Sequence, residues 1–260
     1  MEKVLLTVSR WVHESPLWMK KLTSRFLAWL WWDVMKFRIL VAHRNLRQAF
    51  PLLSRQERFA LAKRSLVQLC GNFIDLLMVP AMDQDGLRKY VQWEGEEHLR
   101  QAFREKKGVL LLGLHMDSGD AAVACLALRG YSIHLITKRF KSPWMDRFWF
   151  SMRRKSGAHY IEAHGKQTAY DILKALKKNE CVAFVNDQQM GPPYGMKTKF
   201  FGRHTGTAYG LALFALKTRA PIIPVYILRQ PDWRQKMIIE PELRFSFAEE
   251  MDREAQIQAL

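Results

Sequence analysis

The stretch GVLLLGLHMDSGDAA, residues 108–122, joins a short aliphatic run to a histidine and an acid. Its first part, Gly108 to Leu114, carries no charge and has the length of one buried strand. The apolar run stops at His115, and a helix rich in small residues is expected from Asp120. Because ligands and catalytic groups in open α/β sheets gather beyond the carboxyl ends of the strands, the stretch predicts a strand, a functional loop and a helix.

Short apolar runs and helical segments alternate along the rest of the chain. We expect strands at residues 108–114, 132–137, 181–185 and 222–228, and helices at residues 120–128, 143–155, 167–178 and 205–217. A strand followed by a helix, repeated several times, predicts an α/β fold with a mostly parallel central sheet and helices on both of its faces.

Residues 1–50 differ in composition from residues 51–260, which we expect to form the α/β domain. The first 50 residues contain nine Lys and Arg, three acids, and five of the nine tryptophans, at positions 11, 18, 29, 31 and 32. A helix after Pro16 would place Leu22, Phe26 and Trp29 on one side, as in a helix that lies in a membrane interface. We expect an amphipathic membrane-associating helical region here; the alternative is a helix that packs on its own domain.

The net charge indicates an anionic partner. The formal charge of +16 suits nucleic acid, acidic lipid or an acidic carrier protein, and does not choose among them. The three cysteines form no closely spaced pair, which disfavours a zinc knuckle or a disulfide framework. No apolar run approaches the roughly 18 to 20 residues that span a bilayer, and no signal peptide is evident, so we expect the chain to stay on the cytosolic side.

His115 and Asp120 are the expected catalytic pair. Ser118 and Gly119 supply a turn that would bring the two side chains together at the start of the helix. Asp120 would then accept the imidazole N–H, and the other ring nitrogen would take a proton from a hydroxyl. The bare H-x-x-x-x-[DE] pattern arises about once by chance in such a sequence, so a histidine with ordinary structural hydrogen bonds is the alternative.

Four sequence segments together indicate a family. HRNLRQAFPLLSRQER, GVLLLGLHMDSGDAA, ILKALKKNECVAFVNDQQMG and KTKFFGRHTGTAYGLALFALKTRAPIIPVY are similar, in order and spacing, to segments of the bacterial lipid A biosynthesis acyltransferases, the lauroyl and myristoyl transferases. The resemblance implies transfer of a fatty acyl chain from acyl carrier protein to a hydroxyl of a lipid A precursor, at the cytoplasmic face of the inner membrane, by a peripheral or monotopic protein. It maps the catalytic dyad onto His115 and Asp120, and a site-shaping D-Q-x-x-G loop onto Asp187, Gln188 and Gly191.

The sequence departs from the family pattern in three places. Asp117 adds an anion where the family has an aromatic-rich stretch, and Lys166, which we expect to bind substrate, stands where many members carry an arginine. The chain ends at Leu260 without the family's Trp/His/Arg-rich C-terminal segment, so we expect substrate contacts from that region to be missing. These differences keep the acyl-transfer chemistry and leave the acceptor open.

Further residues are expected to bind substrate. Residues 138–155 hold seven cations, one acid and several aromatics, and among them Arg139 and Arg154 are expected to contact a sugar phosphate or an acidic carrier. The alternative is a helix with its aromatics inward and its cations in solvent. Asp187 is expected at the site or as a turn cap, and Arg203 is expected to close the site beside Phe200 and Phe201, which are expected in the core or lining an acyl channel.

Two other functions stay open beside the leading one. The first is acylation of another glycolipid or a phospholipid from acyl-CoA, since both donors carry anionic phosphopantetheine. The second is a basic protein that binds nucleic acid or an anionic membrane without catalysis. No signature of a nucleic-acid-binding fold supports nucleic acid, so none is expected as a partner. The chemistry requires no cofactor, and His159 and His164 lack further ligands, so no metal is expected.

Overall fold

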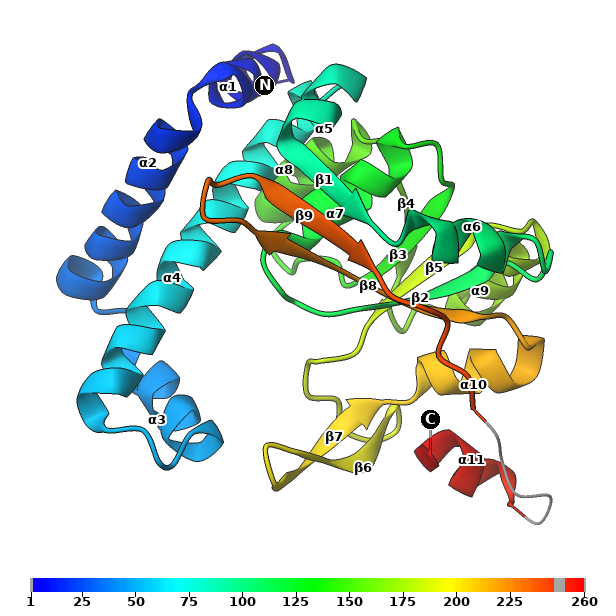
Figure 1. The fold of residues 1–260 in the computed structure, drawn as a ribbon. Helices are drawn as coiled ribbons and strands as arrows, with labels where there is room; N and C mark the ends of the chain where they lie inside the picture. The colour runs from blue at the N-terminus through cyan, green and yellow to red at the C-terminus, as the bar shows by residue number, and fades with distance from the viewer. Residues whose placement is uncertain (1, 246–250, 260) are drawn as a thin grey trace.

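A seven-stranded sheet organises the protein, as the computed structural model shows for residues 2–245 and 251–259 (Figure 1). The strand order is β1-β9-β8-β2-β5-β3-β4. These strands span Val91–Glu94 (β1), Val109–Gly113 (β2), Ile133–Thr137 (β3), His159–Glu162 (β4), Cys181–Val185 (β5), Ile222–Arg229 (β8) and Gln235–Ile239 (β9). All neighbouring pairs are parallel except β8 and β9. The expected mostly parallel α/β fold is confirmed.

Helices cover both faces of this sheet. The α-helices of the described residues span Glu2–Glu14 (α1), Leu17–Trp29 (α2), Ile39–Ala49 (α3), Arg55–Met78 (α4), Gln84–Tyr90 (α5), Glu96–Phe103 (α6), Gly119–Leu128 (α7), Pro143–Arg154 (α8), Thr168–Lys177 (α9), Gly210–Thr218 (α10) and Arg253–Ala259 (α11). A π-helix, Leu30–Met35, and a 3-10 helix, Val79–Ala81, follow α2 and α4.

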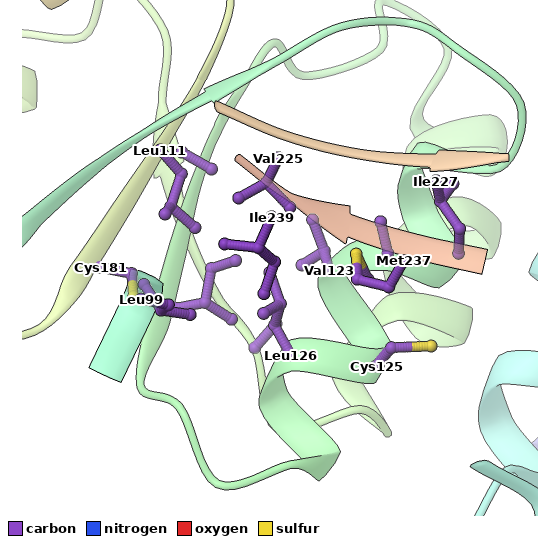
Figure 2. Close-up of a cluster of buried hydrophobic side chains, with 14 of the residues drawn as sticks. Leu99, Leu111, Val123, Cys125, Leu126, Cys181, Val225, Ile227, Met237 and Ile239 are labelled. Atoms are coloured by element: carbon purple, nitrogen blue, oxygen red, sulfur yellow. The ribbon is translucent and has the colours of Figure 1, made fainter. Parts of the chain in front are cut away.

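Strand β2 shows why its sequence is apolar throughout. Successive side chains point to opposite faces of a strand, and both faces of β2 are covered. Leu111 packs in one cluster with Val123 and Leu126 of α7, and Figure 2 shows these three side chains. Leu110 packs in the other cluster, with α9 and α10. The central strand is therefore fixed from both sides, and its carboxyl end holds the loop with His115 in place.

The prediction of a helix over residues 205–217 was wrong at the start of that helix. Residues 203–208 form strand β7, Arg203–Ala208, which pairs with β6, Gly195–Phe200, in a separate antiparallel hairpin. Helix α10 begins only at Gly210. β-Branched Thr205 and Thr207 favour a strand, and a Cβ at position 206 would collide with the Met190 carbonyl, so this position requires the glycine. The short strands β1, β4 and β9 were also not expected.

The N-terminal helices pack along α4. A capping box formed by Ser54 and Glu57 begins α4, and α2 contacts α4 over much of its length. Helix α2 buries only small or polar side chains, namely Lys20, Ser24 and Ala28. Its large apolar side chains, Trp18, Leu22, Phe26 and Trp29, are exposed. Within the described residues, no helix is long and apolar enough to cross a membrane.

Candidate active site

Two adjacent strands bring His115 and Asp187 together. Strands β2 and β5 pair in parallel with Gly113 opposite Val185, and each functional residue lies two positions beyond that pair. His115 Nδ1 lies 2.6 Å from Asp187 Oδ1, and the His115 backbone N–H donates to Asp187 Oδ2 over 2.8 Å. The carboxylate thus fixes both the ring and the backbone of His115.

This hydrogen-bond pattern assigns the tautomer of His115. A carboxylate only accepts, so Nδ1 carries the proton and Nε2 keeps its lone pair. The Gln188 side-chain amide lies 3.2 Å from Nε2 and can donate to it. His115 is about half exposed, so its Nε2 side is open to a substrate. The imidazole can therefore act as a general base through Nε2, while Asp187 orients the ring through Nδ1.

Asp120 does not form the expected hydrogen bond with His115. It lies in the first turn of α7, and its Oδ1 accepts from Arg153 Nε over 2.6 Å. Both imidazole nitrogens have other partners, Asp187 and Gln188. The physical reason is the turn before α7, where Asp117 has a positive φ of 42° and the helix then directs Asp120 toward α8. Asp120 nevertheless lines the same cavity as His115.

A buried polar network fixes the loop that follows His115. The Asp117 carbonyl accepts from Asn72 Nδ2 over 2.6 Å, and the Asp117 carboxylate accepts from the Arg229 backbone N–H over 2.8 Å. The Arg229 guanidinium pairs with Asp75 over 2.6 Å, with side chains 1% and 0% exposed. Tyr90 donates to the same acid over 2.5 Å, and burial together with Asp75 raises the pKa of Tyr90 well above its ordinary value.

A cavity of about 300 Å³ opens beside His115. Helix α4 supplies one wall, and the strands and α7 supply the others. Its apolar lining includes Leu69, Phe73, Leu76, Leu111, Ala122, Val123, Leu126, Ile133, Leu135, Ala183, Val185, Val225 and Ile227. Asp117, Asp120 and Arg153 are charged groups in the same lining. The arrangement suits a long apolar group that ends at a reactive polar centre.

The remaining expected site residues lie elsewhere. Arg139 pairs with Asp146 over 2.5 Å, and Arg154 donates to the Phe150 carbonyl. Lys166 is exposed before α9, and Arg203 is exposed at the end of the β6–β7 hairpin. None of these four cations is among the residues that line the cavity.

Arg153 was not singled out from the sequence as a site residue, although the spacing of residues in α8 indicates that it faces inward. The buried residues Asp146 and Phe150 of α8 lie seven and three positions before Arg153, so helical spacing places all three on the inward face. Besides Asp120, the Arg153 guanidinium donates to Thr137 Oγ1 over 3.2 Å. Asn72 and Arg229 were also missed, because their roles depend on contacts between segments about 160 residues apart.

Comparisons with known proteins identify the family of this chain. The model of the family described as bacterial lipid A biosynthesis acyltransferase matches residues 5–260. The chain is 24% identical over 211 residues to a lipid A biosynthesis lauroyltransferase of Escherichia coli (strain K12), covering 80% of this chain and 68% of that protein. A palmitoleoyltransferase of lipid A biosynthesis from the same organism matches with the same identity and coverage.

A third relative is a lipid A biosynthesis acyltransferase of Haemophilus influenzae (strain ATCC 51907 / DSM 11121 / KW20 / Rd), 24% identical over 207 residues, with 79% of this chain and 64% of that protein covered. The chain thus spans about two thirds of the length of these relatives. Because the family model matches nearly the whole sequence, this chain belongs to the bacterial lipid A biosynthesis acyltransferase family, a family of acyltransferases.

Proposed function

We propose that this protein transfers a fatty acyl chain from an acyl thioester to a hydroxyl of a lipid A precursor or a related glycolipid, with His115 as the general base. The observation that carries the proposal is the geometry of His115. Its Nδ1 is bound to Asp187, and its Nε2 keeps a lone pair beside a largely apolar cavity.

The proposed reaction begins when the acceptor hydroxyl replaces the Gln188 amide at Nε2. His115 takes the hydroxyl proton as the oxygen attacks the thioester carbonyl, and a C–O bond forms. Asp187 stabilises the resulting imidazolium, as the acid of a catalytic triad does. When the C–S bond of the tetrahedral intermediate breaks, the imidazolium returns the proton to the leaving thiolate.

The developing oxyanion needs donors close to the same centre. The first turn of α7 begins at Gly119, four residues after His115, and the amino end of a helix favours negative charge. Arg153 adds a cation in the cavity lining, held by Asp120. We assign this electrostatic role to Arg153, with Asp120 as the carboxylate that positions its guanidinium, in place of the role of orienting His115 that the sequence predicts for Asp120.

The cavity is proposed to hold the acyl chain. Its walls come from α4 on one side and from the sheet and α7 on the other, and most of its lining is aliphatic or aromatic. Burial of each methylene contributes about 0.8 kcal/mol, so the chain itself would supply much of the binding energy. Acyl carrier protein is the proposed donor because the similarity to the lipid A acyltransferases implies it, and acyl-CoA is the alternative because the positive surface suits either anionic donor.

The N-terminal helices are proposed to hold the protein on the cytoplasmic face of the inner membrane as a peripheral or monotopic enzyme. Helix α2 exposes Trp18, Leu22, Phe26 and Trp29, while Lys20, Ser24 and Ala28 pack inward. Such a surface, next to many Lys and Arg, suits the interface of an anionic bilayer.

The test is acyl transfer by the purified protein, followed by mass spectrometry of a lipid A precursor incubated with acyl carrier protein thioester or with acyl-CoA. We expect one added acyl mass with the wild type, and a loss of about 10²–10⁴-fold in rate for His115→Ala. His159→Ala is the matched control, because His159 lies on β4 outside the cavity lining. Full activity of His115→Ala would overturn the proposal, as would equal loss in both variants.

A further inference from the structure

The β6–β7 hairpin carries an exposed aromatic tip. Phe200 and Phe201 are 57% and 52% exposed, in contrast to the core or channel position expected from the sequence. The two rings contact each other edge to face with their centroids 4.7 Å apart. Neither residue is among those that line the cavity beside His115. Two large apolar side chains therefore stand at a protruding end of the molecule.

The turn of this hairpin is built at a conformational cost. Phe200 pairs with Arg203, so Phe201 and Gly202 form a two-residue connection. Both have positive φ, 47° and 71°, which is the turn type that favours Asn-Gly or Asp-Gly. A bulky residue such as phenylalanine rarely adopts a positive φ. Strain of this kind, kept at an exposed position, points to a function for the side chain rather than for the fold.

A second apolar segment, about 150 residues away in sequence, meets the tip. The Phe50 ring lies edge to face against Phe201, with centroids 5.4 Å apart. Leu52, two residues later in the turn between α3 and α4, is 99% exposed. Figure 1 shows the hairpin pointing toward this end of the α3–α4 pair. We name Phe50, Leu52, Phe200 and Phe201 the tip surface.

Cations surround the tip surface. Lys197, Lys199 and Arg203 of the hairpin are exposed, and Arg47 is exposed at the end of α3. No acidic residue occurs in the sequence from residue 188 to residue 231. Within the part of the chain that the structure describes, none of these four cations belongs to an ion pair. Apolar side chains surrounded by such cations suit the interface of an anionic bilayer, where the cations contact the headgroups and the apolar side chains contact the hydrocarbon.

We propose that the tip surface is a second membrane contact, which inserts its apolar side chains into the interface of an anionic bilayer. This inference rests on the membrane association proposed above for the N-terminal helices. A bilayer fits better than a protein partner, because a protruding tip needs a matching hollow in a protein but none in a lipid interface. The hairpin follows β5 through Asp187 and Gln188, so its contact would orient the site toward lipid acceptors.

The test uses the full chain and a fluorescent label at the tip. All three native cysteines are buried, so Phe201→Cys can be labelled selectively with a dye that reports polarity. Trp18→Cys labels α2, and Tyr170→Cys on α9 is the matched control at an exposed aromatic site outside both surfaces. Each protein is mixed with vesicles of phosphatidylglycerol and phosphatidylethanolamine, and separately with vesicles of phosphatidylcholine alone.

We expect a blue shift at position 201 with the anionic vesicles and none at position 170. A shift at position 18 without one at 201 overturns the tip contact and leaves the N-terminal contact standing. A shift at 201 alone supports the tip contact and removes the N-terminal one. No shift at position 201 with the anionic vesicles overturns the proposal.

A second variant separates binding from folding. Phe201→Asn places a residue that tolerates positive φ in the turn, so we expect an unchanged or higher melting temperature. We also expect the variant to bind anionic vesicles about tenfold more weakly in a sedimentation assay, because it lacks one aromatic ring that would insert into the interface. Unchanged vesicle binding by this variant, with the fold intact, would contradict a lipid role for Phe201.

Discussion

At the scale of single residues, the chemistry depends on which carboxylate orients His115. The resemblance of the sequence to lipid A acyltransferases implies Asp120, whereas the hydrogen bonds favour Asp187, whose carboxylate lies 2.6 Å from Nδ1. Asp120 is engaged with Arg153 over the same distance. We therefore propose separate roles for the two acids. Asp187 orients His115, and Asp120 holds Arg153 in the cavity lining.

Replacement of each acid by its amide tests this division. In Asp187→Asn, the new amide can donate to Nδ1 and favour the tautomer whose Nε2 carries the proton, which cannot act as a base. We expect kcat to fall about 10²–10⁴-fold with KM nearly unchanged. In Asp120→Asn we expect a smaller fall in kcat, because the hydrogen bond to Arg153 Nε can be kept by the amide oxygen. Steady-state kinetics of both variants measures the difference. A larger fall in kcat for Asp120→Asn than for Asp187→Asn would show that Asp120 orients His115.

At the scale of elements, helix α4 holds the loop that follows His115 as well as one wall of the cavity. Asn72 donates to the Asp117 carbonyl and accepts from the Arg229 guanidinium, so one side chain joins α4, the loop and β8. The positive φ of Asp117 needs such support from its surroundings. Asn72 is thus a positioning residue for His115, which lies two residues before Asp117.

Loss of this link should affect the reaction more than substrate binding. For Asn72→Ala we expect kcat to fall about tenfold with little change in KM for the acyl donor, because the apolar cavity walls remain. Loss of two hydrogen bonds should lower the free energy of unfolding by about 1–3 kcal/mol. Kinetics and urea unfolding measure the two effects. Asn45→Ala, at an exposed position of α3, is the control, and an unchanged kcat in Asn72→Ala would exclude the positioning role.

The elements also show what the sequence could predict. Strands β2 and β5 are continuous apolar runs, and β8 and helix α7 are apolar or small-residue runs apart from Arg229 and Asp120 at their ends, so the type and place of all four follow from pattern alone. The β6–β7 hairpin alternates lysine with threonine and glycine, and its pattern is too weak to separate from a helix start. The pairing of His115 with Asp187 depends on β2 and β5 being neighbours, which strand order in space decides and sequence order does not.

At the scale of the whole molecule, the protein joins an apolar cavity, an oriented imidazole and exposed aromatic surfaces at the N-terminal helices and the hairpin tip. A lipid acceptor and a fatty acyl chain would approach such a site from a membrane, while the positive charge attracts the anionic headgroups and donor. We propose that this protein adds one acyl group to a glycolipid of the lipid A type.

The most direct measurement is mass spectrometry of the membrane glycolipids from cells that lack the protein, compared with cells that carry the wild type or His115→Ala. We expect the glycolipid of the deficient cells to be lighter by one fatty acyl chain, the wild type to restore the mass, and His115→Ala not to restore it. Glycolipid masses that are identical in all three strains would contradict this proposal.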